Sequence, residues 1–450
     1  MFVTAMNYQD CLAYLTALGH ELRGVKFDLV NMRHIAAALG HPERSYPSVI
    51  VAGTNGKGST CAMLASILEC AGYRTGLYTS PHLVRVNERI RVNGEEIADD
   101  DFALAFSEVK EAVSGPLAGG TPAAPPSFFE FLTATAFLHF ARQRVDLAVL
   151  EVGMGGRLDA TNIVEPEVAV ITNVELDHML FLGNTHAKIA GEKAGVMREG
   201  KPVVSGCGHP DAVRVVREHA AALGADLIEL PGLVRVANLH RDEGRCGFDL
   251  AVNGTRFAHL KAALRGRFQV NNASAAITAA WQLRKRGWRI PDSAFAEGLA
   301  GTNWPGRLEP CGERPLTLLD GGHNPAAARA VAEYVRTELA GRPLALVYAS
   351  MRDKAIEEIA EWLFPCAVQI YLTHTGQPRA ATPQEILARV PPRLTVSKTQ
   401  LEPDPVQAVA AARRSLPPQG VVLVAGSLFL VGAIKEAVAA ACASSESVAY

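Results

Sequence analysis

The sequence is poor in the features that mark secreted, disulfide-bonded or zinc-binding proteins. Its 450 residues contain only 8 cysteines, which are scattered along the chain without a Cys-x-x-Cys pair. This spacing excludes a zinc finger and a cysteine scaffold. The first ten residues, MFVTAMNYQD, contain no basic segment followed by a long apolar run, as a secretory signal would. We therefore expect reduced thiols and a cytoplasmic protein.

Long apolar runs and an excess of charge of one sign are also missing. The most apolar late stretch, residues 420–434, is interrupted by Gly426, Ser427 and Gly432. It predicts a buried strand, a turn and a helix instead of a membrane span. Lys and Arg number 44 and Asp and Glu 46, which gives a formal net charge of −2. A balance this even argues against binding to nucleic acid or to a membrane surface.

The composition of the sequence is that of an ordinary globular protein, and its length is sufficient for two to three domains. It is 48% hydrophobic and 20% charged. Short apolar runs typical of buried strands alternate with segments of helical periodicity. This alternation predicts an α/β fold with a doubly wound parallel sheet. Residues 225–265 are richer in strand-forming residues and predict an antiparallel appendage.

A domain boundary is predicted at the segment GTNWPGRLEP, residues 301–310, which has Pro and Gly without periodicity. We place the first domain at residues 1–303 and the second at 304–450. Beyond the boundary, strand-like runs separated by helical segments predict a second, smaller α/β domain. These runs are LTLLD (316–320), LALVYA (344–349), AVQIYL (367–372) and VVLVAG (421–426).

The stretch SVIVAGTNGKGST, residues 48–60, predicts a phosphate-binding loop. The apolar residues 49–51 read as a buried strand, a glycine-rich turn follows, and a helix is expected from Ser59. Glycines let the backbone approach an anion closely, and the helix N-terminus adds a partial positive charge. Lys57 lies within the turn, where it can reach the outer phosphates of a nucleotide. The strand, the lysine and the helix together favour a nucleotide site over a simple tight turn.

Polar side chains stand where neighbouring predicted strands end. Ser80 follows the second strand and Glu151 ends the third, while Asp177 or His178 stands just beyond the fourth. Taken singly, each is readily explained as a turn cap, an arginine partner or a loop histidine. Because ligands of α/β sheets bind at the carboxyl ends of strands, their common placement favours a site. Hard oxygen ligands beside a phosphate loop predict magnesium.

A series of motifs runs through most of the chain, from about residue 27 to about residue 432. In order they are GTNGKGST, TSPHL with RVNERIRVNGEEI, FFEF, EVGMGGRLDATNIV, LDHMLFLGNT, EKAGVM, WPGRLE and DGGHNP. In these motifs the chain resembles dihydrofolate synthases and folylpolyglutamate synthases of the Mur ligase superfamily. Gly322 replaces the alanine usual in the last motif. The segment ASMRDKA, residues 349–355, keeps only Asp353 and Lys354 of its usual pattern.

The resemblance implies a Mur ligase-like fold, with a doubly wound P-loop domain and a smaller Rossmann-like α/β domain at the C-terminal end. It also implies that Ser80 and Glu151 hold a first Mg²⁺ and that His178 holds a second. Lys193, in EKAG, resembles a lysine that carries a carbamate (N6-carboxylysine), because the added negative charge helps to hold metal. Without the modification, Lys193 would be read as a helix-surface lysine. Lys57, His178 and Lys193 are thus the implied catalytic residues.

The same resemblance implies two binding sets. The nucleotide would lie between the domains, so that closure completes the site. The implied ATP-binding residues are Thr54, Asn55, Gly56, Lys57, Gly58, Ser59, Asn272, Arg307, Asp320 and His323. The pterin pocket would offer an aromatic wall and a carboxylate, although at least one of its two phenylalanines is expected in ordinary core. Its implied residues are Asp28, Leu29, Ser127, Phe128, Phe129, Glu130, Leu158, Asp159 and Ala160.

The implied reaction is ATP-dependent amide formation. A substrate carboxylate attacks the γ-phosphate of ATP, and the amine of L-glutamate then attacks the acyl phosphate. The substrates would be dihydropteroate, reduced folates and L-glutamate, with ATP as co-substrate, two Mg²⁺ and a monovalent cation. Because the site is complete within one chain, we expect a monomer.

Three other functions stay open on the sequence alone. One is an enzyme with only one of the two glutamate-adding activities. Another is a cell-wall Mur ligase, against which TSPHL and LDATN argue. The third is a nucleotide-gated regulatory ATPase. Such a switch needs one magnesium, whereas Glu151, His178 and Lys193 together imply two.

Overall fold

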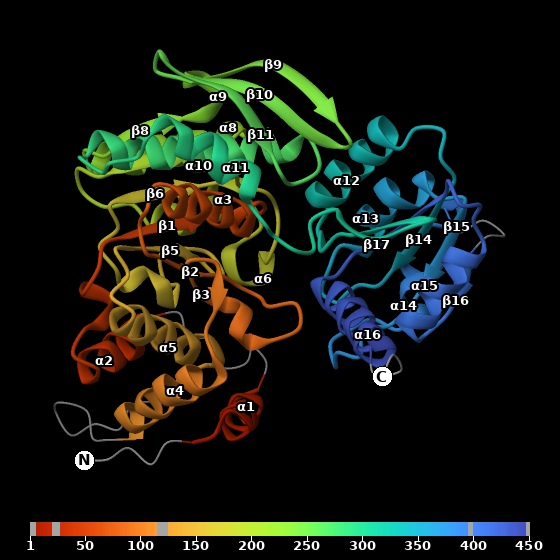
Figure 1. Ribbon diagram of the computed structural model, residues 1–450, viewed down its shortest axis with the longest axis horizontal. Helices are drawn as coiled ribbons and strands as arrows, with labels where there is room; N and C mark the ends of the chain where they lie inside the picture. The colour runs from red at the N-terminus through yellow and green to blue at the C-terminus, as the bar shows by residue number, and fades with distance from the viewer. Residues whose placement is uncertain (1–5, 20–27, 115–124, 395–398, 447–450) are drawn as a thin grey trace.

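The computed structural model describes residues 6–19, 28–114, 125–394 and 399–446. Figure 1 shows two bodies side by side, each built around its own sheet. The first sheet has eight strands and the second has six, and a separate three-stranded sheet lies at one end of the first body. The predicted α/β class with parallel sheets is confirmed.

The first sheet places the predicted phosphate loop at its centre. Its order is β4-β3-β2-β5-β1-β6-β7-β8, and all neighbours from β2 to β8 run parallel. β1 is buried along its whole length, because helices cover both faces of the sheet. The strands are β1 (Ser48–Ala52), β2 (Thr75–Tyr78), β3 (Ile90–Val92), β4 (Glu95–Glu96), β5 (Leu147–Glu151), β6 (Val168–Ile171), β7 (Pro202–Ser205) and β8 (Asp226–Glu229).

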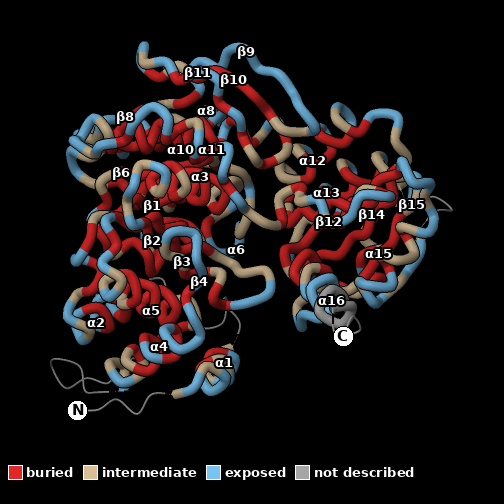
Figure 2. Tube along the Cα trace, in the orientation of Figure 1, coloured by how far each residue is buried: buried red, intermediate tan, exposed pale blue. Residues whose placement is uncertain are grey.

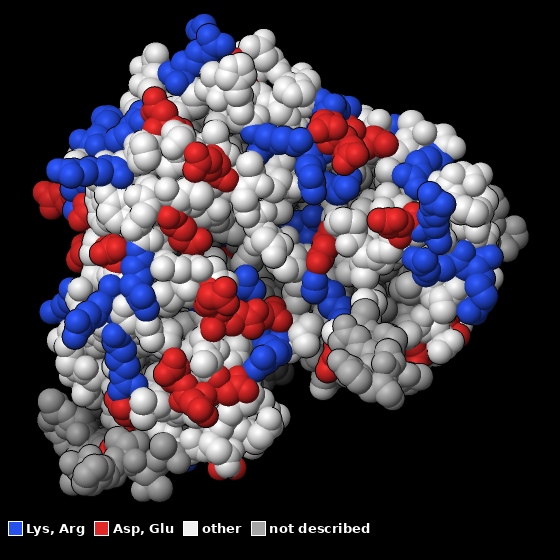
Figure 3. All heavy atoms as spheres, in the orientation of Figure 1, with Lys and Arg blue, Asp and Glu red and all other residues white. Residues whose placement is uncertain are grey.

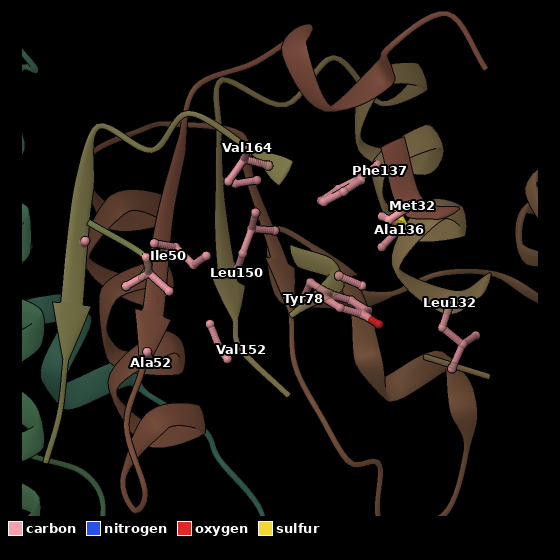
Figure 4. Packing of buried hydrophobic residues seen from close by; sticks show 14 of the residues in the cluster. Met32, Ile50, Ala52, Tyr78, Leu132, Ala136, Phe137, Leu150, Val152 and Val164 are labelled. Carbon is pink, nitrogen blue, oxygen red and sulfur yellow. The ribbon is translucent and has the colours of Figure 1, made fainter. Parts of the chain in front are cut away.

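Alternate residues of β1 enter two separate hydrophobic cores. Ile50 and Ala52 belong to one cluster, and Val49 and Val51 belong to the other. Figure 4 shows the first cluster, in which sheet side chains such as Ile50 pack with residues of the covering helices. The helices of this body are α1 (Tyr8–Ala17), α2 (Val30–Ala38), α3 (Lys57–Cys70), α4 (Asp99–Ser114), α5 (Phe128–Arg142), α6 (Met179–Leu182), α7 (His186–Ala194), α8 (Pro210–Ala222), α9 (Leu230–Leu233), α10 (Phe268–Lys285) and α11 (Asp292–Gly301).

The predicted antiparallel appendage is confirmed. It consists of β9 (Val234–Asp242), β10 (Arg245–Val252) and β11 (Thr255–Ala262). β10 is largely buried, and its Phe248 and Leu250 join the second cluster of the first body. β9 forms the exposed edge (Figure 2). The earlier part of the predicted stretch is different, because β8 pairs with β7 in the main sheet.

The second sheet contains the four predicted strands and two more. Its order is β12-β13-β17-β14-β15-β16, and β13 to β16 are parallel neighbours. β12 and β16 escaped prediction because these edge strands are mostly exposed and lack an apolar run. The elements are β12 (Glu309–Glu313), β13 (Leu316–Leu319), β14 (Leu344–Tyr348), β15 (Gln369–Leu372), β16 (Thr399–Leu401), β17 (Val421–Ala425), α12 (Pro325–Glu338), α13 (Ile356–Leu363), α14 (Pro383–Arg389), α15 (Pro405–Arg414) and α16 (Leu428–Glu446).

The apolar stretch at residues 420–434 forms β17, a turn and the start of α16, as predicted. None of the helices in the described segments has the length and apolar character that a membrane crossing requires. On the face shown in Figure 3, basic and acidic side chains are interspersed.

Candidate active site

A cleft of about 800 Å³ lies between the two bodies. Its walls combine the phosphate loop and the carboxyl ends of β2, β5 and β6 with the start of α10, the start of α12 and the loop after β14. Most residues predicted for metal, nucleotide and pterin line this one cleft, although they come from distant parts of the chain. The carboxyl ends of parallel strands thus form the site, as expected for open α/β sheets.

The phosphate loop turns directly from β1 into α3. The helix begins at Lys57, two residues before the predicted Ser59, after Gly56 in the left-handed region at φ +81°. No side chain caps this helix, so the amides of its first turn have no side-chain partner, and the residues that carry them line the cleft. A side chain at Gly56 would collide with Asn272 of α10. The loop therefore offers bare amides and the Lys57 ammonium to an anion.

Ser80 and Glu151 lie together beside this loop. The backbone N–H of Ser80 donates to Glu151 Oε2 at 3.1 Å. Glu151 is only 4% exposed, and its burial raises the pKa of its carboxyl, opposed chiefly by Lys57. Burying a carboxylate is unfavourable unless a cation compensates it. This pair therefore fits a metal ion bound next to the phosphates.

Asp177 and His178 separate into two roles. The Asp177 carboxylate accepts hydrogen bonds from Lys354 Nζ at 2.8 Å and from Asn324 Nδ2 at 3.1 Å, both in the second body. Burial opposes its ionisation, but His178, Lys354 and His323 outweigh burial and hold the pKa of Asp177 well below its usual range. Asp177 is therefore occupied by an interdomain contact.

The imidazole of His178 is the strand-end group that stays available as a ligand. Burial lowers the pKa of His178 to about 4, so the ring is neutral near pH 7. Among the described residues, no hydrogen bond engages this ring, and His178 lines the cleft. The described residues contain no group of three His, Cys, Asp or Glu side chains that could hold a metal ion by themselves. Ser80, Glu151 and His178 thus suit ions whose remaining ligands are water and phosphate oxygens.

Lys193 is not a surface lysine. It is 3% exposed on α7, and its Nζ donates to the carbonyl oxygen of Gly53 in the phosphate loop at 2.8 Å. Burial, and then the charge of Lys57, lower the pKa of Lys193 to about 7. The amine is therefore partly uncharged at neutral pH, which is the form that reacts with CO₂.

The residues predicted for the nucleotide converge from both bodies. Asp320 is buried at the end of β13, where it accepts from the backbone N–H groups of Leu308 at 3.0 Å and Gly322 at 2.8 Å. The Asn272 amide donates to Gln269 at 2.8 Å. The predicted set lies along the cleft as Thr54, Asn55, Gly56, Lys57, Gly58, Ser59, Asn272, Arg307, Asp320 and His323.

Asn324 links the two bodies directly, a contact that the sequence does not predict. Asn324 caps α12 by accepting from Ala327 N at 2.9 Å. Its amide also pairs with that of Asn55 in the phosphate loop, through bonds of 2.8 and 3.2 Å. The Asn-Pro pair before a helix was visible as a cap signal. The pairing of Asn324 with Asn55, 269 residues away, has no signal in the sequence.

The predicted pterin residues divide into those that line the cleft and those that do not. Ser127 caps α5, and Glu130 completes the capping box through Oε2, which also accepts from Asn31. Phe128 packs under Arg89, 5.4 Å from the guanidinium, and like Leu29 is absent from the cleft wall. The lining members are Asp28, Ser127, Phe129, Glu130, Leu158, Asp159 and Ala160.

Comparison with known proteins gives consistent matches over nearly the whole chain. Residues 51–280 match the Mur ligase middle domain, and residues 306–428 match the Mur ligase glutamate ligase domain. The dihydrofolate synthase/folylpolyglutamate synthase of Bacillus subtilis is 34% identical over 431 residues, which are 95% of this chain and 98% of that protein.

Solved structures agree with the sequence matches. Escherichia coli FolC in complex with DHPP and ADP has a TM-score of 0.85 at 31% identity, covering 96% of this chain and 98% of that one. The bifunctional folylpolyglutamate synthase/dihydrofolate synthase of Yersinia pestis, complexed with AMPPNP and Mn ion, has a TM-score of 0.83 at 31% identity, with the same coverage.

Proposed function

The chain belongs to the Mur ligase family, in the group of dihydrofolate and folylpolyglutamate synthases, and from this premise we propose that it is an ATP-dependent glutamate ligase for folates. It adds L-glutamate to dihydropteroate, which forms dihydrofolate, and to tetrahydrofolate and its polyglutamates. The observation that carries the proposal is that one cleft is lined from both bodies. The first body contributes the phosphate loop, Glu151, His178 and Phe129, and the second contributes Arg307 and Asp320.

The proposed chemistry is activation followed by amide formation. The acceptor carboxylate attacks the γ-phosphorus of ATP, which forms an acyl phosphate and releases ADP. The amine of L-glutamate then attacks the acyl carbon, phosphate leaves, and the amine loses a proton. Lys57 and the first-turn amides of α3 stabilise the charge on the transferring phosphoryl group. The protein's main contribution is to position the reactants, because no side-chain nucleophile is needed.

We assign the divalent metals to the first wall of the cleft, which is the wall formed by the first body. Ser80 and Glu151 would hold one ion and His178 a second, and these ions would neutralise phosphate charge. Lys193 would carry a carbamate: the ammonium first loses a proton, and the free amine then adds CO₂ and releases a second proton, so that an anion would replace a buried cation next to the proposed metals. The lowered pKa of Lys193 supports this assignment. Solution ¹³C NMR of protein kept in ¹³C-bicarbonate should give a carbamate signal that Lys193→Met abolishes.

The decisive experiment measures phosphate release from ATP with Mg²⁺ and L-glutamate. Dihydropteroate, tetrahydrofolate and a sample without acceptor are compared, and products are identified by mass spectrometry. Release and glutamylated products with both acceptors support the bifunctional enzyme. Products with only one acceptor restrict the protein to that activity. No ligation by protein that binds ATP would contradict the proposal and favour a regulatory ATPase.

Two further properties belong to the proposal. We infer a monomer, because all proposed site residues come from one chain, and a light-scattering mass equal to that of one chain at every concentration would support this. A stable dimer would contradict it. We also infer that a monovalent cation assists the reaction, so that activity at constant ionic strength should be higher with K⁺ than with tetramethylammonium.

A further inference from the structure

The loop that carries Ser80 contacts the second body through Leu83. Figure 1 shows the segment between β2 and β3 extending toward α16. The side chain of Leu83 packs against the buried apolar cluster of the second body that contains Val431 and Ile434. The Leu83 side chain also lies over Gly306, in the linker between α11 and β12. A Cβ added at Gly306 would be 3.4 Å from both Leu83 methyl groups. A partly buried residue of the first body thus packs against the core of the second body.

The backbone of Leu83 fits into a notch on α16. Gly432 is buried in this helix, and a Cβ at this position would be 2.9 Å from the carbonyl carbon of Leu83 and closer still to its oxygen. That separation is well inside van der Waals contact, and the obstacle is backbone. Gly432 is therefore required for the loop and the helix to approach as they do.

The loop is braced so that a shift at Leu83 is transmitted to Ser80. The Glu88 carboxylate accepts hydrogen bonds from the backbone N–H groups of Leu83 at 2.7 Å, and of Val84 and Arg85 at 2.8 Å each. At the other end of the loop, the Ser80 N–H is bonded to Glu151. Because both ends are held, the loop has little freedom to absorb a displacement locally.

The linker is fixed at the same point. Gly306 N donates to Glu309 Oε2 at 2.8 Å, and the other oxygen of Glu309 pairs with Lys435, one turn after Gly432 on α16. Arg307 follows Gly306 directly and lines the cleft. One contact therefore joins the loop of a proposed metal ligand, the linker that carries a proposed nucleotide ligand, and α16.

From this geometry we propose that Leu83 and Gly432 form a pivot that sets Ser80 and Arg307 in register across the cleft. They are positioning residues and touch no reacting atom. The inference rests on the proposed function, since it takes Ser80 as a metal ligand and Arg307 as a nucleotide ligand. Domain movement would turn about this contact while the first and second bodies keep their own folds.

The test compares Gly432→Ala, Leu83→Ala and Leu83→Met with the unmodified protein. Misplacement of a site by about 1 Å costs up to about 10²-fold in rate. We expect Gly432→Ala to lower kcat at least about tenfold and to raise the Mg²⁺ concentration for half-maximal activity, with the KM for dihydropteroate unchanged. Leu83→Ala should show the same pattern more weakly, and Leu83→Met should recover most of the activity. Val84→Ala is the control, because Val84 shares the loop and is 38% exposed.

Binding of ADP at varied Mg²⁺ is measured in parallel by equilibrium dialysis, together with Tm. Weaker Mg²⁺-dependent binding by Gly432→Ala, measured at a temperature well below the Tm of that variant, supports the pivot, even in an assay without ligation. Unchanged Mg²⁺ dependence of both activity and binding would overturn it, as would an equal effect of Val84→Ala. If the unmodified protein ligates glutamate to neither acceptor, the proposed function is contradicted. The ADP-binding measurement would still test the pivot in that case.

Discussion

The two walls of the cleft hold their polar groups by different means. On the first wall, Glu151 and Lys193 are bonded within their own domain, to Ser80 and to the phosphate loop. On the second wall, Asn324 and Lys354 reach across the cleft to Asn55 and Asp177. Glu151 and Lys193 are therefore preorganised within the first body, whereas Asn324 and Lys354 contribute through docking of the two bodies. We infer that changes on the first wall affect the chemistry itself and that changes on the second affect how the domains meet.

The largest expected effect is on the first wall, where Lys57→Ala should lower kcat by about 10³-fold, because it would remove the positive charge that we propose stabilises the transferring phosphoryl group. The measurement is phosphate release at saturating ATP. Circular dichroism and Tm should match the unmodified protein. A loss below about tenfold would show that the loop lysine does not face the reacting phosphate.

The second expected effect concerns the ion pair between the walls. Lys354 and Asp177 are 11% and 10% exposed, so Lys354→Met leaves a mostly buried carboxylate without its cation. Such a loss costs about 3 kcal/mol in the free energy of unfolding. Urea denaturation measures this loss, and the double variant Lys354→Met with Asp177→Asn should recover much of it. Equal stability of the single and double variants would show that the pair does not couple the domains.

The third expected effect is a pH dependence on the first wall. Burial lowers the pKa of Lys193 to about 7 from 10.5. Between about pH 7 and pH 10.5, Lys193 is protonated in the unfolded chain but not in the folded chain, so the free energy of unfolding rises with pH. In CO₂-free buffer this contribution rises by at most about 1.4 kcal/mol per pH unit between pH 7 and 10. Lys193→Met should lack it, and parallel profiles for the two proteins would contradict the assigned burial.

The smallest expected effect is on the second wall, at Asn324. Asn324→Ala removes the cap of α12 and the amide pair with Asn55, and should cost about 1 kcal/mol in stability. Asn324→Ser keeps a cap but loses the pair. We expect both variants to raise the KM for ATP severalfold and only Ala to lower Tm. If Ser behaves as the unmodified protein in both measurements, the pair with Asn55 has no role in docking.

The same contrast explains what the sequence could predict. The phosphate loop, Ser80 and Glu151 were found because strand ends in a parallel sheet meet at one edge, so that local pattern determines position. The burial of Lys193 was not visible, because its helix has a composition compatible with a surface. The bond between Asp177 and Lys354 spans 177 residues. Neither that bond nor the notch at Gly432 leaves a local signature, since each depends on how two separately folded domains meet.

The most direct test of the account follows oxygen from the acceptor to the released phosphate. Dihydropteroate labelled with ¹⁸O in its carboxylate is incubated with the protein, Mg²⁺, ATP and L-glutamate, and the phosphate is analysed by mass spectrometry. If the carboxylate attacks the γ-phosphorus within the closed cleft, the phosphate carries one ¹⁸O and the folate product keeps the other. Unlabelled phosphate would mean that water attacks ATP, and the protein would then be an ATPase instead of a ligase.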